Sequence, residues 1–420
     1  MCGVASIASA PWVFWSRAGS VVALTVLLVT APAAASAQEE QPPSLSLVDA
    51  QRLAQGEAPD VLLSEARAVT ARTEIGVAGM FPNPQLQVGT TAGTPVIFGT
   101  FFIALPLFGQ RKAAMDAADA QARIATAGVE VTKLDARLAV SIAWLDLWQL
   151  EGEYRIATNN AARRDKILDT AQARFSEGAA PRLEVLRAQA DARRARSDVS
   201  SLEKQRAAAA ARLAVLVSRD EPITVGIEGE PRVVESVPDL AALEGFIEQH
   251  PLTNRARTML RAAGAIVTRE RRARRPLVGV QVGGSFFDRA PPPKHDGTAS
   301  LKVNLPFFNR PLIARAESAR DTAQTELDTV VAQLRARIAS ARADYLAAVR
   351  RQQAQVTEVL PATQEAADLS DEAYQSGGLD LTGVLAAEQA LSDARLAALR
   401  ATADRARALS ALEHAAGRAL

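Results

Sequence analysis

The sequence predicts a mainly α-helical chain with a small β part, in which one structural unit occurs twice. Two stretches, 108–178 and 308–377, carry helical periodicity with almost no proline. Four short segments alternate polar and apolar residues, which is typical of β-strands. Landmarks in the first half of the chain return in the second half at a nearly constant spacing, which indicates an internal duplication.

The charge balance excludes one class of protein. The 420 residues include 48 Lys and Arg against 47 Asp and Glu, whereas a nucleic-acid-binding protein needs a basic surplus. Aromatic residues make up only 5% of the chain, so large core side chains are scarce and closely packed, alanine-rich helices are expected.

Residues 1–37 have the features of a signal peptide. Arg17 precedes the apolar run 21–29, and Ala35-Ser36-Ala37 forms a small-residue cleavage site. The apolar run is shorter than the roughly 20 residues of a membrane-spanning helix, so we predict export with cleavage after Ala37. The one cysteine, Cys2, lies within this leader, and no cysteine chemistry is expected in the mature chain.

Three landmarks establish the duplication. Pro59 recurs as Pro251 after 192 residues, the Leu-Pro element at 105 recurs after 200, and the segment that begins at Phe175 recurs from Tyr374 after 199. The eight-residue surplus falls around 289–297, which indicates a longer loop there.

Each repeat is predicted to contain a helix, a β-hairpin and a long helical hairpin. The first repeat covers 38–230, with its β-hairpin at 84–107 and its helical tip near Gly178, and the second covers 231–420, with its β-hairpin at 277–307 and its tip near Gly377. At about 1.5 Å per residue, each long helical stretch measures roughly 100 Å. Apolar positions recur along it at three- and four-residue steps, so these helices need packing partners.

Alternation along the strands separates an apolar face that suits lipid from a polar face that suits water. The residues expected to face lipid are Leu86, Val88, Val278, Val280, Val282, Leu301, Val303 and Leu305, together with Phe101, Ile103 and Leu105 from the strand that alternates least cleanly. The residues expected to line a lumen are Gln85, Gln87, Gln281, Lys302 and Asn304. The strands alone leave one alternative open, a half-buried sheet on a soluble domain.

Four strands are too few to close a transmembrane barrel, because the smallest such barrels have about eight and open edges cannot face lipid. The chain is therefore expected to form an oligomer. Three copies would supply twelve strands, and cyclic symmetry would arrange the helical hairpins in a ring that continues the barrel. We predict a homotrimer whose β-barrel, with four strands per chain, is continued by an α-helical barrel.

Several short motifs occur at defined points in the predicted order of helices and strands. They are Ala58-Pro59-Asp60, the segment 81–86 that enters the first strand, the two Leu-Pro-x-Phe elements and the two tip segments. Together they resemble the TolC-type outer-membrane efflux factors of Gram-negative bacteria, over nearly the whole mature chain. Segments 305–310 and 108–112 are similar to the heavy-metal, CzcC-like branch of that family.

The resemblance implies a homotrimeric channel in the cell outer membrane whose helical barrel extends into the periplasm. The implied partners are outer-membrane lipid, a periplasmic adaptor and an inner-membrane pump of the resistance-nodulation-division class. The channel would passively conduct divalent heavy-metal cations, or otherwise drugs, to the exterior. The exit duct of a type I protein secretion system has the same fold and stays an alternative, whereas a periplasmic adaptor lacks the four strands and the full duplication.

No enzymatic activity, cofactor or metal site is expected. The sequence contains no P-loop, H-E-x-x-H, G-x-S-x-G or C-x-x-C motif. His250, His295 and His414 are far apart, and a metal site needs converging ligands, so structural or solvent-facing roles are expected for them. The arginine-rich run 269–275 ends a helix, and we expect it to form a solvated or lipid-headgroup-facing collar.

Gly178 and Gly377 are predicted to form the helical tips, because glycine tolerates the positive φ that a chain reversal needs. The resemblance also places a gate here. It puts Tyr374 at the family's gate tyrosine and Glu184 at the acidic position that accepts from it. The alternative is that both are ordinary surface residues.

Part of the family's gate is missing from this sequence. The gate arginine falls at Leu379, and the two inner carboxylates fall at Gly383 and Ala386. Arg182 and Asp380 are the expected substitutes.

Overall fold

The structure of the chain is a computed structural model that describes residues 45–90, 97–226, 231–232, 234, 236–286, 296–306 and 309–420. The predicted signal peptide with Cys2, most of the expected loop at 289–297 with His295, and residues 307–308 lie outside the described residues. Both predicted repeats belong to one compact unit, residues 42–420.

The first repeat has the predicted order, with one helix more than expected. Its elements are α1 Leu47–Glu57, α2 Pro59–Ala78, β1 Gln85–Thr90, β2 Ile97–Leu105, α3 Gln110–Ser176 and α4 Arg182–Leu216. The helix breaks at Ala58 because Pro59 has no N–H to continue a preceding helix but fits the first turn of the next one. α3 runs without interruption over 67 residues.

The second repeat follows the same order with more interruptions. Its elements are α5 Leu240–Glu244, the 3-10 helix η1 Ile247–Gln249, α6 Pro251–Ala273, β3 Leu277–Phe286, β4 Gly297–Asn304, α7 Arg310–Ala354, the π-helical turn η2 Gln355–Val359, α8 Leu360–Gln375 and α9 Leu381–Ala416. The long helical stretch from α7 to α8, which leads from the sheet to the tip, includes this π-helical turn just before Pro361. Proline offers no N–H and crowds the preceding turn, and the wider turn accommodates it.

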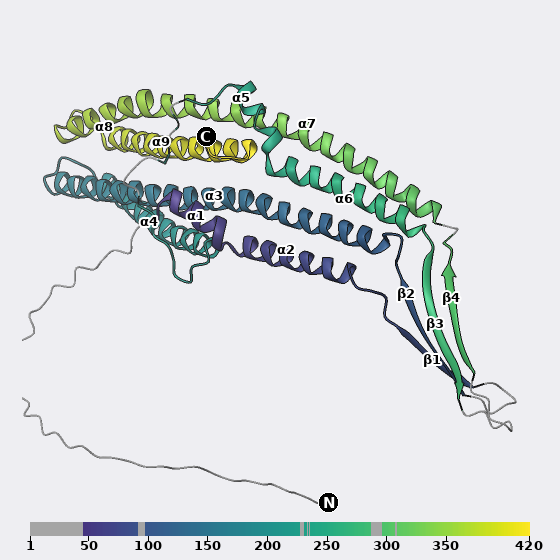
Figure 1. Cartoon of the computed structure of the whole chain (residues 1–420). Coiled ribbons are helices and arrows are strands. Elements are labelled where there is room, and N and C mark those ends of the chain that lie inside the picture. The colour runs from purple at the N-terminus through teal and green to yellow at the C-terminus, as the bar shows by residue number, and fades with distance from the viewer. Residues whose placement is uncertain are drawn as a thin grey trace, which may run out of the picture. The chain divides into compact units, whose positions relative to one another are not determined.

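The four strands form one antiparallel sheet in the order β1-β2-β3-β4, which lies beyond the ends of the long helices (Figure 1). β2 pairs with β3 along its whole length, from Ile97 opposite Phe286 to Leu105 opposite Val278. The two repeats thus share one sheet, and β1 and β4 are its two edges.

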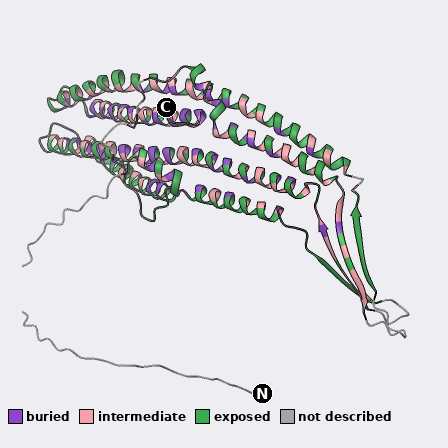
Figure 2. Ribbon diagram, viewed as in Figure 1, coloured by how far each residue is buried: buried purple, intermediate pink, exposed green. Residues whose placement is uncertain are grey.

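α3 is the centre of the helical part, because α2, α4, α6 and α9 all pack against it. Buried positions line the facing sides of these helices, whereas β1 and β4 are mostly exposed (Figure 2). One core cluster joins α1, α3, α4 and α9 through Ala50, Trp144, Leu213 and Ala403. The Trp144 indole Nε1 also donates to the Leu45 carbonyl at 2.8 Å, which fastens the start of the described chain to α3.

No helix among the described residues combines the length and the apolar character that a bilayer crossing would require.

His250 is a structural residue, as expected. It is 1% exposed and caps the N-terminus of α6, with Nδ1 accepting from the Leu252 N–H at 3.1 Å. Nε2 lies 3.3 Å from the His414 carbonyl and donates to it. These two contacts require the neutral ring, since a protonated Nδ1 could not accept from Leu252. Burial lowers the pKa of His250, and the nearby His414 and Arg337 lower it further, against the opposing effects of Asp135 and of the bond to the His414 carbonyl.

The buried His250 predicts a loss of stability in mild acid. Below its ordinary pKa of 6.5 the unfolded chain binds a proton that the folded chain resists, so the free energy of unfolding should fall as the pH drops from there toward the lowered folded value. The variant His250→Asn keeps a capping side chain without a titrating ring. Its thermal midpoint should fall less between pH 7 and 5 than that of the wild type, and equal slopes would contradict this role.

Candidate functional site

The tips of the two helical hairpins are built alike. Gly178 has φ +76° and Gly377 has φ +79°, which is the left-handed conformation expected of them. The N–H after each glycine bonds back across the last helical turn, from Ala179 to the Arg174 carbonyl and from Gly378 to the Ala373 carbonyl, both at 2.8 Å. This is the Schellman end, which satisfies the last carbonyls of a helix and reverses the chain.

Tyr374 lies in the contact between the two tips. It is 1% exposed and belongs to an apolar cluster with Ile167 and Ala171 of α3, Ala188 of α4 and Val384 of α9. Tyr374 is therefore not a surface residue. The sequence alone left open that Tyr374 and Glu184 are both ordinary surface residues, and the burial of Tyr374 excludes this for the tyrosine.

Arg174 is the cation of this contact, and sequence reasoning missed it. Its guanidinium lies 4.9 Å from the centroid of the Tyr374 ring, and its Nη1 donates to the Tyr374 carbonyl at 3.2 Å. No sequence signal marks Arg174, because the duplication aligns it with Ala373 and many other arginines occupy the same helix.

Two buried polar atoms at the tips have no hydrogen-bond partner in the described residues. They are the Tyr374 hydroxyl and Oε2 of Glu184. Burial raises the pKa of Tyr374, and the negative charge of Glu184 raises it further while Arg174 opposes both. The Tyr374 hydroxyl can donate a hydrogen bond and the Glu184 carboxylate can accept one, but no hydrogen bond joins them. Leaving a buried polar atom without a hydrogen bond costs about 1–3 kcal/mol of folding free energy.

The two expected substitutes for the missing parts of the gate differ in role. Asp380 caps α9, since its Oδ1 accepts from the Gly383 N–H at 2.9 Å. Arg182 is exposed at the start of α4 and forms no ion pair with the described residues. The structure brings neither of them to Tyr374.

A series of ion pairs joins α3 to α9 along the contact between the hairpins. The pairs are Arg163 with Glu388 at 2.6 Å, Glu153 with Arg400 at 2.8 Å, Asp146 with Arg407 at 2.7 Å and Arg137 with Glu413 at 2.8 Å. His414 Nε2 lies 2.8 Å from Asp135 Oδ1 at the end of the series. Glu153, Glu388 and Glu413 are buried, and removing one partner of a buried pair typically costs about 3–5 kcal/mol. These pairs hold the two hairpins in one register.

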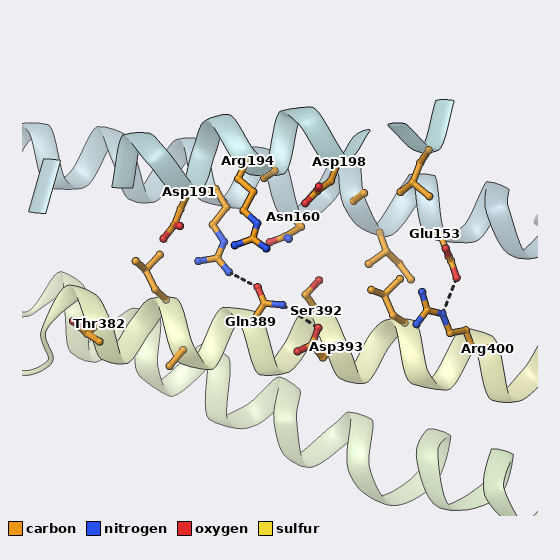
Figure 3. Close-up of a pocket in the computed structure, with 18 residues that line it drawn as sticks. Glu153, Asn160, Asp191, Arg194, Asp198, Thr382, Gln389, Ser392, Asp393 and Arg400 are labelled. Carbon is orange, nitrogen blue, oxygen red and sulfur yellow. Dashed lines mark hydrogen bonds and ion pairs between the residues drawn. The ribbon is translucent and has the colours of Figure 1, made fainter. Parts of the chain in front are cut away.

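The series flanks a polar cavity of about 640 Å³ between α3, α4 and α9 (Figure 3). Asp191 and Asp198 of α4 face Asp393 and Arg400 of α9 across it. Oδ1 of Asn160 is buried there without a hydrogen-bond partner among the residues that the structure describes. No group of three or more His, Cys, Asp or Glu that could hold a metal ion occurs in the described parts of the chain.

The sheet register collects the predicted apolar residues on one face. Leu86 pairs with Phe101 and Phe101 with Val282, while Ile103 pairs with Val280 and Val280 with Leu301, and directly paired residues point to the same side. Large apolar side chains on this face are exposed, for example Leu86 at 73% and Leu301 at 66%. Leu105, Val278 and Val303 form a third row, and Leu305 follows the end of β4.

The opposite face carries the predicted polar residues and two unpredicted aromatic ones. Gln85 pairs with Phe102 and Phe102 with Gln281. The Phe102 ring fills the space above Gly279, where a Cβ would come within 2.2 Å of it, and the Phe98 ring similarly covers Gly89. Lys302 lies 5.2 Å from the Phe102 centroid. β2 alternates poorly in sequence because aromatic side chains lie over glycines on its polar face.

Comparison with known proteins gives a consistent picture. The family model described as outer membrane efflux protein matches residues 51–219 and 246–418. The cobalt-zinc-cadmium resistance protein CzcC of Cupriavidus metallidurans is 24% identical over 347 residues, which cover 80% of this chain and 81% of that protein.

Solved structures share the fold. A membrane protein from Pseudomonas aeruginosa has a TM-score of 0.73 at 20% identity, with 89% of this chain and 90% of that chain covered. The MtrE outer membrane channel of Neisseria gonorrhoeae, in its open state, has a TM-score of 0.71 at 18% identity, with 89% of each chain covered. The resemblance recognised in the sequence is confirmed.

Proposed function

This chain belongs to the outer membrane efflux protein family, and we propose that it is the channel of a tripartite efflux system, joined to a periplasmic adaptor and an inner-membrane pump. The protein lies in the cell outer membrane and extends into the periplasm. The observation that carries the proposal is the pairing of an exposed apolar sheet face with helical hairpins of about 100 Å. The channel supplies a passage, and the pump supplies the energy.

A homotrimer is proposed on the edges of the sheet. β1 pairs only with β2 and β4 only with β3 among the described residues, which leaves two rows of backbone N–H and C=O groups without strand partners. Such rows cannot remain unpaired in lipid. Pairing β4 of one copy with β1 of the next satisfies both rows, and three copies close a twelve-stranded barrel of a size that known outer-membrane barrels have.

The two faces of the sheet then take different surroundings. The face with Leu86, Val280 and Leu301 meets lipid, and the face with Gln85, Gln281 and Lys302 lines the lumen. Lipid contact explains why so many large apolar side chains are exposed on a single chain. An apolar side chain gains free energy when it leaves water, and contact with lipid provides this gain where the protein itself does not cover the side chain.

Adjacent positions of β3 give a matched test of the faces and of the trimer. Val280→Arg places a charge on the lipid face and should cost about 2–4 kcal/mol near the bilayer midplane, whereas Gln281→Arg stays in the lumen. We expect the recovery of folded trimer from outer membranes, measured by native mass determination, to fall sharply for Val280→Arg alone. Equal losses would show that the faces are wrongly assigned, and a stable wild-type monomer would contradict the trimer.

The hairpin tips are proposed as the gate. The Tyr374 hydroxyl and Glu184 Oε2 are a buried donor and acceptor without hydrogen-bond partners among the described residues, and one charge-assisted bond between them would satisfy both. Arg174, stacked on the Tyr374 ring, holds the ring at the contact. Arg174 is thus the nearest counterpart in this chain of the family's gate arginine, whose aligned position holds Leu379.

Channel conductance in planar bilayers tests the gate. A bond between Tyr374 and Glu184 is worth about 1.5–3 kcal/mol when shielded from water, so Tyr374→Phe and Glu184→Gln should each increase the open fraction. The double variant should open little further, because both changes delete one bond. Tyr154→Phe is the matched control, since Tyr154 also lies under an arginine, Arg206 at 4.4 Å, but away from the tips. Wild-type conductance in both tip variants would place the gate elsewhere.

Divalent heavy-metal cations are the proposed cargo. The support is the CzcC relative, named for resistance to cobalt, zinc and cadmium, together with the motif at 305–310. A strain that lacks the gene should become sensitive to these cations, and complementation should restore growth. Sensitivity to drugs alone would assign a drug pump, and loss of a secreted protein would assign the type I secretion duct instead.

A further inference from the structure

Three helix ends meet where the helices give way to the sheet. They are the C-terminus of α6 and the N-termini of α3 and α7. Nε2 of Gln110 in α3 donates to the Pro276 carbonyl at 3.1 Å, and Arg271 of α6 forms an ion pair with Glu317 of α7 at 2.6 Å. These contacts bring 107–116, 269–275 and 309–317 together, and we name these three segments the basic collar.

The collar is strongly cationic in an otherwise neutral chain. It contains nine Lys and Arg against three Asp and Glu, while the whole chain has 48 against 47. Seven of the nine are exposed and form no ion pair with the described residues: Arg111, Lys112, Arg272, Arg274, Arg275, Arg310 and Arg315.

Helix dipoles account for only one part of this charge. Cations at the C-terminus of α6 are favoured by its dipole, but Arg111 and Lys112 begin α3 and Arg310 begins α7, where a dipole disfavours cations. Neither α3 nor α7 has an acidic residue in its first turn that would offset these cations. An anion bound from outside would reverse this penalty, because helix N-termini and guanidinium groups both favour phosphate.

The surroundings of the collar indicate where that anion comes from. Leu107 and Leu312 are exposed apolar side chains at these helix ends. Met80 and Phe81, which follow α2, are exposed as well and lie beside them, since Arg111 is 4.6 Å from the centroid of the Phe81 ring. The apolar sheet face begins directly beyond these residues. Apolar and basic side chains side by side suit the surface of a bilayer, with the former in the acyl region and the latter at the headgroups.

We infer that the basic collar binds the phosphates of anionic phospholipids at the bilayer surface. The inference rests on the proposed membrane location and deepens it, because it makes the junction of sheet and helices a site for a particular class of lipid. Arginine suits this task, since its planar guanidinium can donate two bonds to one phosphate.

Native mass spectrometry of the full-length, detergent-extracted protein tests the collar. The protein is offered equal amounts of phosphatidylglycerol and phosphatidylcholine with identical acyl chains. We expect the wild type to retain phosphatidylglycerol preferentially, and Arg272→Gln/Arg274→Gln to reduce that preference by roughly fivefold or more. Arg310→Gln/Arg315→Gln should do the same from another helix. The control Arg350→Gln/Arg351→Gln removes two exposed charges from α7 well away from the sheet and should behave as wild type.

Each other outcome overturns the inference in a distinguishable way. Equal retention of the two lipids by the wild type, or an unchanged preference in both collar variants, would contradict the collar while leaving the channel intact. Displacement of the lipid by an excess of free glycerol phosphate would assign a soluble phosphate site instead. A protein that retained neither lipid would contradict the membrane location and the collar together.

Discussion

The pairing of α3 with α9 through charged side chains is the constraint on which the rest of the molecule depends. α3 belongs to the first repeat and α9 to the second, and the ion pairs from Arg137–Glu413 to Arg163–Glu388 fix their antiparallel register. Charged pairs specify register more strictly than alanine-rich apolar contact, because a slip of one turn leaves buried carboxylates without partners. The tips and the shared sheet therefore occupy defined positions at opposite ends of the same long helices.

Features of the fold that depend on local sequence were predictable. The strands follow from alternation, the tips from Gly178 and Gly377, and the two-repeat order from recurring prolines. The π-helical turn was not predicted, although Pro361 was visible, because a proline inside a helix permits a kink, a break or a widened turn and only tertiary packing selects among them.

The site was predictable only in part. The family pattern pointed to Tyr374, and the structure adds that its side chain is buried and that its hydroxyl has no hydrogen-bond partner in the described parts of the chain. Arg174 and the aromatic cover of Gly89 and Gly279 depend on which residues face each other across distant elements, such as α3 against α8 or β2 against β3. Periodicity assigns a residue to a face but does not name its neighbour, so these contacts needed the structure.

The ion pairs between the hairpins end well before the tips. Arg163 precedes the end of α3 by thirteen residues, which corresponds to about 20 Å of helix. Beyond Arg164, the bond from Arg174 to the Tyr374 carbonyl is the only hydrogen bond or ion pair that joins the two hairpins within the described residues. Because few hydrogen bonds and ion pairs join the hairpins here, we expect the terminal turns to unfold locally at a lower free energy than the body of the helices. Substitutions at the tip should therefore disturb the stability of the remaining helices little, because the two segments share few polar interactions.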